Sequence, residues 1–115
     1  MIYLNNCAAC HRPDGVGYER VFPSLAGNPV VQAENPQSLI SIVLDGSQTP
    51  RTAHTPAQFT MPGFAWRLTD KDVVDVVNFI RTSWGNGAAP VSSADVAGTR
   101  ESLQRRQAST KAPEQ

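Results

Sequence analysis

Two cysteines and a histidine lie within the five residues Cys7-Ala8-Ala9-Cys10-His11. Two thiols at this spacing on a helical turn can reach the two vinyl groups on one edge of a porphyrin. The imidazole of the next residue then projects over the macrocycle and can bind its iron from one face. The pattern therefore predicts one haem c, attached covalently through Cys7 and Cys10, with His11 as the first axial ligand.

Two other types of site share part of this pattern. A thioredoxin-like pair of cysteines would follow a strand and open a longer helix in a βαβ unit, and the sequence shows no such arrangement. A zinc site would need two further cysteines or histidines at paired spacing, and His54 is the one other candidate. Haem attachment is therefore the favoured interpretation.

The second face of the iron needs a ligand of its own or stays open. The chain has two methionines, Met1 and Met61, and Met61 lies directly before Pro62-Gly63 at the end of a Pro-rich segment. A thioether there would tie this segment to the iron, so Met61 is predicted as the second axial ligand. Two alternatives stay open: Met61 could instead fill a gap in the core, and His54 could be the ligand.

A histidine and methionine pair has a consequence for function. The soft, neutral thioether favours the reduced iron and raises the reduction potential relative to two histidine ligands. Two firm protein ligands also leave no position for oxygen or a substrate. The sequence therefore predicts single-electron transfer, with no catalytic residue and no enzyme activity in this chain alone.

Groups that support the haem are less sharply indicated. A ligating histidine normally donates its second N–H to a backbone carbonyl, and the segment Phe22–Leu25 is a plausible source of that carbonyl. Haem propionates need neutralising or hydrogen-bonding partners, because buried charge is costly. Arg51, Trp66 and Arg67 are candidates, and for each arginine a solvated surface position is an equal alternative.

Helix signals surround these residues. A short helix is expected over 1–11, leading into the cysteines, followed by a Gly- and Pro-rich loop over 12–28. A second helix is expected over 36–45, with Asn35 as its N-cap and an apolar stripe at Leu39, Ile40, Val43 and Leu44.

The second half of the chain starts with a long polar loop, 47–63, which contains Met61. The strongest helix is expected over 70–84. Thr69 is its cap, and its valines, Ile80 and Trp84 follow the 3.6-residue period of a helix face. Residues 85–115 are polar and are expected to be a tail or linker, with a weak helix around 94–107. The predicted organisation is a haem domain over 1–84 and a C-terminal tail over 85–115.

Composition excludes several classes of function. The formal net charge of the 115 residues is zero, which argues against a nucleic-acid partner. No apolar run is long enough to cross a membrane. The first residues lack the features of a signal peptide, so we expect that the leader of an exported protein has been removed or that the chain comes from a longer one.

In these features the chain resembles the class I cytochromes c over about residues 1–84. The resemblance implies an all-α fold, with about three main helices and long loops wrapped around one covalent haem. It also implies that the first and last helices of the domain cross, with Tyr3 packing at the crossing and Phe79 as its partner. In the family's pattern, the carbonyl of Pro23 accepts the N–H of the ligating histidine.

A closer resemblance is to the haem domains in the cytochrome c subunit of membrane-bound alcohol, gluconate and sugar-alcohol dehydrogenases. Five segments carry it: Tyr3–Cys7, Phe22–Asn28, Thr60–Phe64, Leu68–Asp70 and Ser83–Gly85. Those subunits usually contain three haem domains, whereas this chain has one C-x-x-C-H motif and six residues before Cys7. The chain is therefore expected to be the last haem domain of a longer subunit together with its C-terminal tail.

This resemblance implies a relay at the periplasmic face of the inner membrane. Its partners would be a dehydrogenase catalytic subunit, other haem domains or a quinone site. Two alternatives stay open: a free, diffusing monohaem cytochrome, and a ligand sensor from which Met61 dissociates. A shuttle usually shows charge asymmetry, and the near-neutral core favours the fixed relay.

Overall fold

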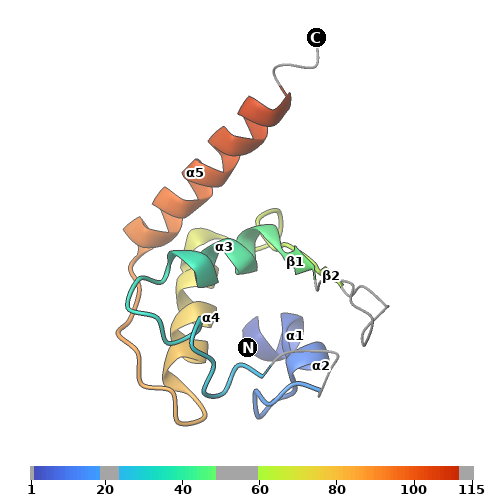
Figure 1. Cartoon of the computed structure of the whole chain (residues 1–115), viewed down its shortest axis with the longest axis vertical. Coiled ribbons are helices and arrows are strands. Elements are labelled where there is room, and N and C mark those ends of the chain that lie inside the picture. The colour runs from blue at the N-terminus through green and yellow to red at the C-terminus, as the bar shows by residue number, and fades with distance from the viewer. Residues whose placement is uncertain (1, 19–23, 49–59, 112–115) are drawn as a thin grey trace.

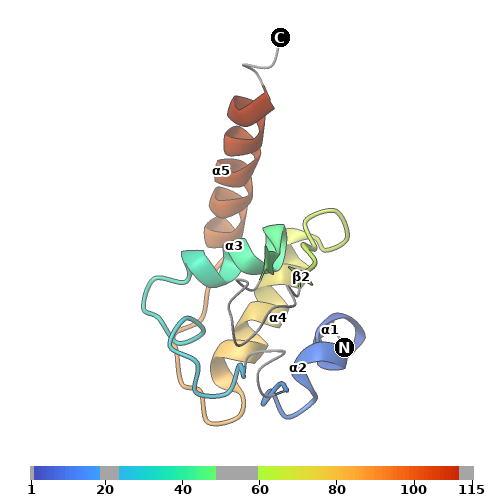
Figure 2. The same ribbon diagram turned by 45° about the vertical axis from the view of Figure 1, so that its right-hand side comes forward.

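The regular secondary structure of the described residues is helical apart from one pair of two-residue strands, which confirms the predicted all-α class. The structure is a computed structural model that describes residues 2–18, 24–48 and 60–111. α3 and α4 lie at the centre, the two N-terminal helices lie at one end, and α5 projects from the opposite end (Figures 1 and 2). The elements in chain order are α1 (Ile2–Asn6), α2 (Ala8–His11), α3 (Gln37–Asp45), β1 (Ser47–Gln48), β2 (Thr60–Met61), α4 (Asp70–Thr82) and α5 (Ser93–Lys111).

The core forms where the apolar faces of these helices meet. α3 contributes the predicted stripe of two leucines, an isoleucine and a valine, and α4 contributes three valines and Ile80. Burying such faces is the main favourable contribution to the folding free energy. The fully buried apolar side chains include Tyr3, Val31, Ile40, Leu44, Val73, Val76, Val77 and Val96.

Capping residues determine where the two central helices begin. Thr69 accepts a hydrogen bond from the backbone N–H of Asp72, whose carboxylate accepts one from the N–H of Thr69, so the predicted cap is a full capping box. For α3 the predicted cap is wrong by one residue: the helix begins at Gln37 with Pro36 at the N-cap position, and the side chain of Asn35 accepts from the N–H of Gln37 at 3.0 Å. Local capping chemistry therefore predicted both starts to within one residue.

The C-terminal end of α4 differs from the prediction. The helix ends at Thr82, not at 84, because the chain turns away through an extended Ser83 and then a positive φ of 55° at Trp84. Trp84 therefore lies outside the helix whose face it was expected to join. The glycine that follows, Gly85, also has a positive φ, of 87°, which closes the turn at little steric cost.

The N-terminal helix is divided at the first cysteine. The expected helix over 1–11 is two short helices, α1 and α2, with Cys7 between them in a turn. The backbone hydrogen bonds from the Cys7 N–H to the Tyr3 carbonyl and from the His11 N–H to the Cys7 carbonyl keep the two helices stacked.

The loop expected over 47–63 is ordered at both of its described ends. β1 and β2 pair antiparallel, with Ser47 opposite Met61 and Gln48 opposite Thr60. Residues 49–59, which include Arg51 and His54, lie outside the described residues. The pairing brings Met61 directly beside the end of α3.

The C-terminal segment forms a helix longer than the weak one expected around 94–107. α5 runs over 19 residues, and Val96 is completely buried at its first turn, while Leu103 is half-buried against the core. Val91, just before α5, is also buried. The apolar residues of this segment are too sparse to show a periodic face, so its packing could not be predicted. Within the described residues, no helix is long and apolar enough to cross a membrane.

Candidate functional site

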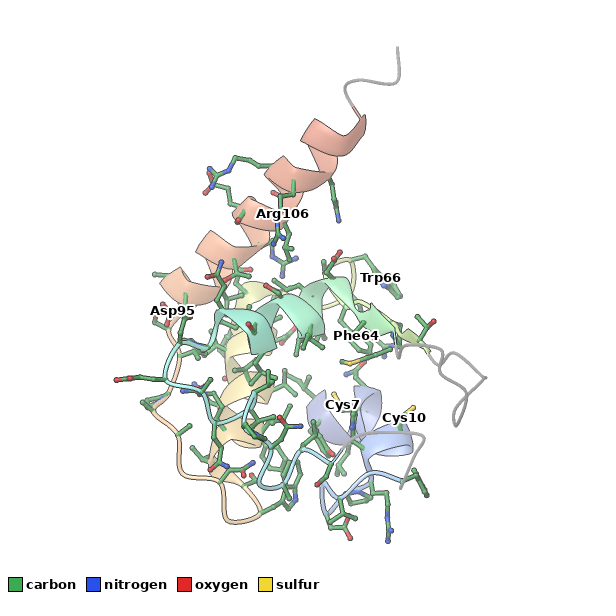
Figure 3. The ribbon with its side chains drawn as sticks, viewed as in Figure 1. Cys7, Cys10, Phe64, Trp66, Asp95 and Arg106 are labelled. Carbon is green, nitrogen blue, oxygen red and sulfur yellow. The ribbon has the colours of Figure 1, made fainter. Side chains whose placement is uncertain are left out.

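The two cysteines and the histidine come together at one end of the core. The side chain of Cys7 is 8% exposed and that of His11 is 7% exposed, while Cys10 is half-buried. Figure 3 shows Cys7 between the two N-terminal helices and Cys10 on α2, with Phe64 on the facing segment that follows β2. The predicted motif thus lies at the core, with one thiol in the apolar cluster.

Both thiols are unbridged. Cys7 and Cys10 form no disulfide with each other. Burial, together with the nearby Cys10, raises the pKa of Cys7 to about 11. A thiol with this pKa is protonated at physiological pH.

Tyr3 holds the turn that follows the motif. Its hydroxyl donates to the carbonyl of Arg12 at 2.6 Å, and Arg12 has a positive φ of 65°. The N–H of Gly17 then donates to the carbonyl of His11 at 3.0 Å. These two bonds fold the chain back just after His11 and so fix the backbone that carries the imidazole.

Three aromatic rings fasten α1 to the end of α4. The ring centroids of Tyr3 and Phe79 are 5.3 Å apart, which confirms the packing expected at this helix crossing. Trp84 completes the cluster, at 5.1 Å from Tyr3 and 5.5 Å from Phe79. Contacts of this kind stabilise beyond the apolar area that they bury.

Trp84 also contacts the loop after the motif, which the sequence did not indicate. Its indole N–H donates to the carbonyl of Pro13 at 3.0 Å. A β-carbon at Gly15 would lie 2.5 Å from the indole ring, so only glycine fits beneath it. The loop that leaves His11 is therefore held from both sides by Tyr3 and Trp84.

We expect Tyr3→Phe to destabilise the protein by about 1 kcal/mol at neutral pH, because the carbonyl of Arg12 loses its donor. Burial raises the pKa of Tyr3 from 10.0 to about 12. The folded state therefore holds the phenol proton more tightly than the unfolded chain does. The contribution of the protonated Tyr3 side chain to the free energy of unfolding is complete below pH 10 and is lost as the pH rises towards 12. Urea unfolding at a series of alkaline pH values should show a shallower loss of stability in the variant, and an unchanged slope would contradict the prediction.

Met61 is half-buried and packs against the same core from β2. The end of α3 holds the segment that carries it. The N–H of Phe64 donates to the carbonyl of Val43 at 2.9 Å, and that of Ala65 donates to the carbonyl of Leu44 at 3.0 Å. The predicted second ligand is thus on a fixed segment, although it was expected within an irregular loop.

Two glycines permit this close approach. A β-carbon at Gly46 would collide with the backbone carbonyl of Met61, and Gly46 has a φ of 84°. A β-carbon at Gly63 would lie 2.6 Å from the carbonyl of Leu44. Both positions therefore require glycine, and the backbone on either side of Met61 lies tightly against the end of α3.

Of the three predicted propionate partners, Trp66 and Arg67 lie at the surface, and Arg51 lies outside the described residues. Trp66 is 82% exposed, and its indole N–H donates to the carbonyl of Gly63 at 3.1 Å. Arg67 is exposed as well. Pro23 and Arg51 lie outside the described residues, as does Phe22 of the segment expected to supply a carbonyl to His11.

Two buried polar side chains were missed by the sequence reasoning. Asn86 accepts from the N–H of Gly27 at 2.8 Å and donates to the carbonyls of Leu25 and Ile80, so it fastens the loop before α3 to α4. Arg81, 1% exposed, donates to three backbone carbonyls. An arginine within an apolar helix pattern gives no local signal for such a role.

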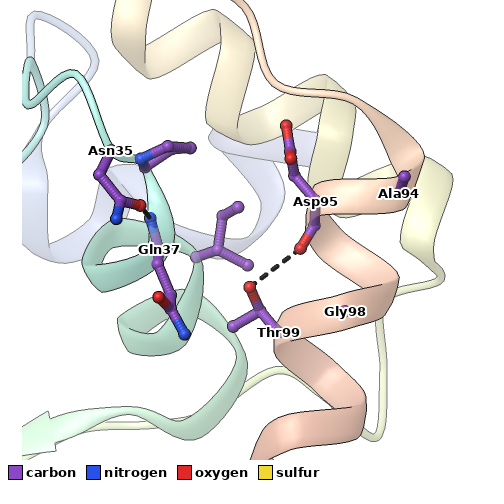
Figure 4. A pocket seen from close by; sticks show the side chains of 8 residues that line it. Asn35, Gln37, Ala94, Asp95, Gly98 and Thr99 are labelled. Carbon is purple, nitrogen blue, oxygen red and sulfur yellow. Dashed lines mark hydrogen bonds between the residues drawn. The ribbon is translucent and has the colours of Figure 1, made fainter.

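A separate pocket of about 280 Å³ lies between the beginnings of α3 and α5. Figure 4 shows Asn35 and Gln37 on one side and Asp95, Gly98 and Thr99 on the other, with Thr99 donating to the carbonyl of Asp95. None of the predicted site residues lines it. This pocket is therefore separate from the cysteine motif and from Met61.

The donor set fits a haem. One buried imidazole and two unbridged thiols three residues apart are the groups that covalent porphyrin attachment would use. The half-buried thioether of Met61, on a segment fixed against the same core, could supply a soft second ligand. Among the described residues, no group of three or more His, Cys, Asp or Glu side chains is arranged to hold a bare metal ion.

Comparison with known proteins agrees with this site. The family model "Cytochrome c" matches residues 1–84. The chain is 49% identical over 100 residues to the cytochrome c subunit of the quinone alcohol dehydrogenase of Gluconacetobacter polyoxogenes, which covers 86% of this chain and 21% of that subunit. It is 49% identical over 102 residues to the gluconate 2-dehydrogenase cytochrome c subunit of Pantoea cypripedii, covering 87% and 23%.

A smaller protein is also similar: cytochrome c-552 of Thermus thermophilus is 32% identical over 84 residues, 70% of this chain and 63% of that protein. The chain spans about a fifth of the length of the dehydrogenase subunits that it matches. The motif, the helical fold and the match over 1–84 agree, and the chain therefore belongs to the cytochrome c family of electron carriers.

Proposed function

We propose that this chain transfers single electrons through one haem c, attached covalently by Cys7 and Cys10 and ligated by His11 and Met61. The observation that carries the proposal is the burial of the motif at the core that Met61 packs against. When bound, the haem supplies an iron that changes oxidation state by one electron. Residues 1–84 would form the haem-carrying unit and residues 85–115 its C-terminal tail, of which Val91, Val96 and Leu103 pack against the core.

The chain's own residues contribute rigidity on both sides of the haem. Tyr3 and Trp84 fix the loop after His11, and the end of α3 fixes the segment around Met61. Two axial ligands held in this way leave no position for a substrate, so the domain carries electrons and does no chemistry on small molecules. Pro23 remains the predicted acceptor for the His11 N–H, with Arg51 and Trp66 as predicted propionate partners.

We further infer that the domain is a relay within a periplasmic dehydrogenase complex and passes electrons towards a quinone or another acceptor. The similarity to cytochrome c subunits of alcohol and gluconate dehydrogenases supports this role. The zero net charge also supports it, because a diffusing shuttle generally uses charge asymmetry to find its partners. Stable co-elution with a dehydrogenase catalytic subunit on size exclusion would favour the relay, and its absence would favour a free cytochrome.

Covalent attachment is tested on the denatured protein. We expect the haem to stay with the polypeptide in acidified organic solvent, and to become fully extractable in a double Cys7→Ala and Cys10→Ala variant. Replacing one cysteine alone should leave a single thioether and an altered absorption spectrum. Extraction of haem from the unaltered protein would refute the proposal.

A further inference from the structure

The C-terminal helix is fastened to the domain at its start. Ser92 and Asp95 form a capping box, with the N–H of Asp95 donating to the Ser92 hydroxyl and the N–H of Ser92 donating to the Asp95 carboxylate. The side chain of Asn78 on α4 bonds both the N–H and the carbonyl of Val91. Together with buried Val96, these contacts fix the first half of α5 over α3 and α4.

Arg100 reaches from this fixed helix to the segment that leaves β2. Its Nε donates to the carboxylate of Asp70 at 2.8 Å, one guanidinium N–H donates to the carbonyl of Ala65 at 2.7 Å, and another donates to that of Leu68 at 2.8 Å. The Arg100 side chain is 20% exposed. A planar fork that makes three short bonds to fixed acceptors is a strong positional restraint.

The two carbonyls belong to the turn directly after Met61-Pro62-Gly63. Within this turn, the N–H groups of Arg67 and Leu68 donate to the carbonyl of Phe64. The N–H groups of Phe64 and Ala65 bond the turn to the end of α3, and Arg100 bonds the carbonyls of Ala65 and Leu68 in the same turn. Between them they hold the chain on the C-terminal side of Met61 against the domain.

We propose that Arg100 is a positioning residue for Met61, so that a helix outside the cytochrome c match holds the second iron ligand in place. This inference rests on the proposed ligation by Met61. The contacts of Arg100 with the turn after Met61 lower the fraction of molecules in which the Met61 segment moves away and the second face of the iron opens. The C-terminal helix would thereby control access of small ligands to the haem.

The test uses imidazole as a probe of the haem-loaded, oxidised protein. Imidazole can bind the iron only when Met61 has left, so its apparent affinity is proportional to the open fraction. Arg100→Met removes all three bonds while keeping the apolar stem. We expect imidazole to bind about tenfold more tightly to this variant, because bonds to a charged donor are lost from the closed state alone. Arg100→Lys, which keeps the charge without the fork, should show a smaller increase.

Two matched controls separate the positioning of Met61 from a general loss of stability. Arg105→Met removes an exposed arginine of the same helix, whose bond is to Glu101, and should leave imidazole affinity unchanged. Thr99→Ala removes a buried hydroxyl of α5 whose bond is to the carbonyl of Asp95. It should lower the free energy of unfolding without a comparable rise in imidazole affinity.

The outcomes distinguish this inference from the proposed ligation. Unchanged imidazole affinity in Arg100→Met, or an equal increase in Thr99→Ala at equal loss of stability, would overturn the positioning role. If the unaltered oxidised protein lacks the sulfur–iron charge-transfer absorption, ligation by Met61 itself is wrong. Should Arg100→Met fail to fold, Asp70→Asn removes the ion pair alone and should tighten imidazole binding about two- to threefold, and no change there would also overturn the proposal.

Discussion

Replacing Met61 with alanine is expected to abolish the sulfur–iron charge-transfer absorption of the oxidised protein. The reduction potential should fall by on the order of 100 mV, because loss of the thioether removes a ligand that favours reduced iron. The fold should persist, since the Met61 segment is held to α3 by backbone bonds from Phe64 and Ala65 that the substitution leaves intact. Optical spectroscopy and redox titration of the haem-loaded variant measure both effects.

His54→Ala is the matched control for this experiment, because His54 is the rival ligand predicted from sequence. It should leave the absorption and the potential unchanged. Loss of the charge-transfer absorption in His54→Ala together with its retention in Met61→Ala would reverse the assignment. Carbon monoxide offers a second readout: the unaltered reduced protein should bind it slowly or not at all, whereas Met61→Ala should bind it rapidly. Rapid binding by the unaltered protein would favour the ligand-sensor alternative.

The parts of the fold that could be predicted from sequence are those that local chemistry determines. Thr69 and Asp72 form a capping box within four residues, so the start of α4 follows from the sequence alone. The apolar stripe of α3 likewise identifies both the helix and its buried face. The end of α4 was missed because the positive φ of Trp84 results from contacts with Pro13 and Tyr3, which are distant in sequence.

The candidate site likewise has one part that local sequence predicts and one part that depends on distant contacts. The cysteine motif is five consecutive residues and needs no tertiary information. The restraints on Met61 come from Val43, Leu44 and, we propose, Arg100, which are 18, 17 and 39 positions away in the chain. No periodic pattern or short motif connects residues so far apart. Met61 could therefore be proposed as a ligand from the sequence, whereas the contacts that hold its segment could not be predicted.

Arg81 is another residue whose contacts could not be predicted from the sequence. Its replacement has the largest expected effect on the free energy of unfolding. We expect Arg81→Ala to lower the free energy of unfolding by about 3–5 kcal/mol. The guanidinium donates to the carbonyls of Ala89 at 2.8 Å, Val31 at 3.1 Å and Ala33 at 2.8 Å, joining two loops to α4. Truncation leaves these acceptors without their donor and also creates a cavity in the core.

Denaturant unfolding of the haem-loaded protein measures this cost. Arg105→Ala is the control, because that arginine makes an exposed i,i+4 ion pair with Glu101, which should contribute less than about 0.5 kcal/mol. Arg81→Lys should fall between the two, since an ammonium keeps the charge but cannot match the geometry of a planar fork. If Arg81→Ala and Arg105→Ala lose similar stability, the buried arginine is not what joins the loops to α4. In that case Asn86, which bonds Leu25 and Gly27 to the same helix, would have to carry that function alone.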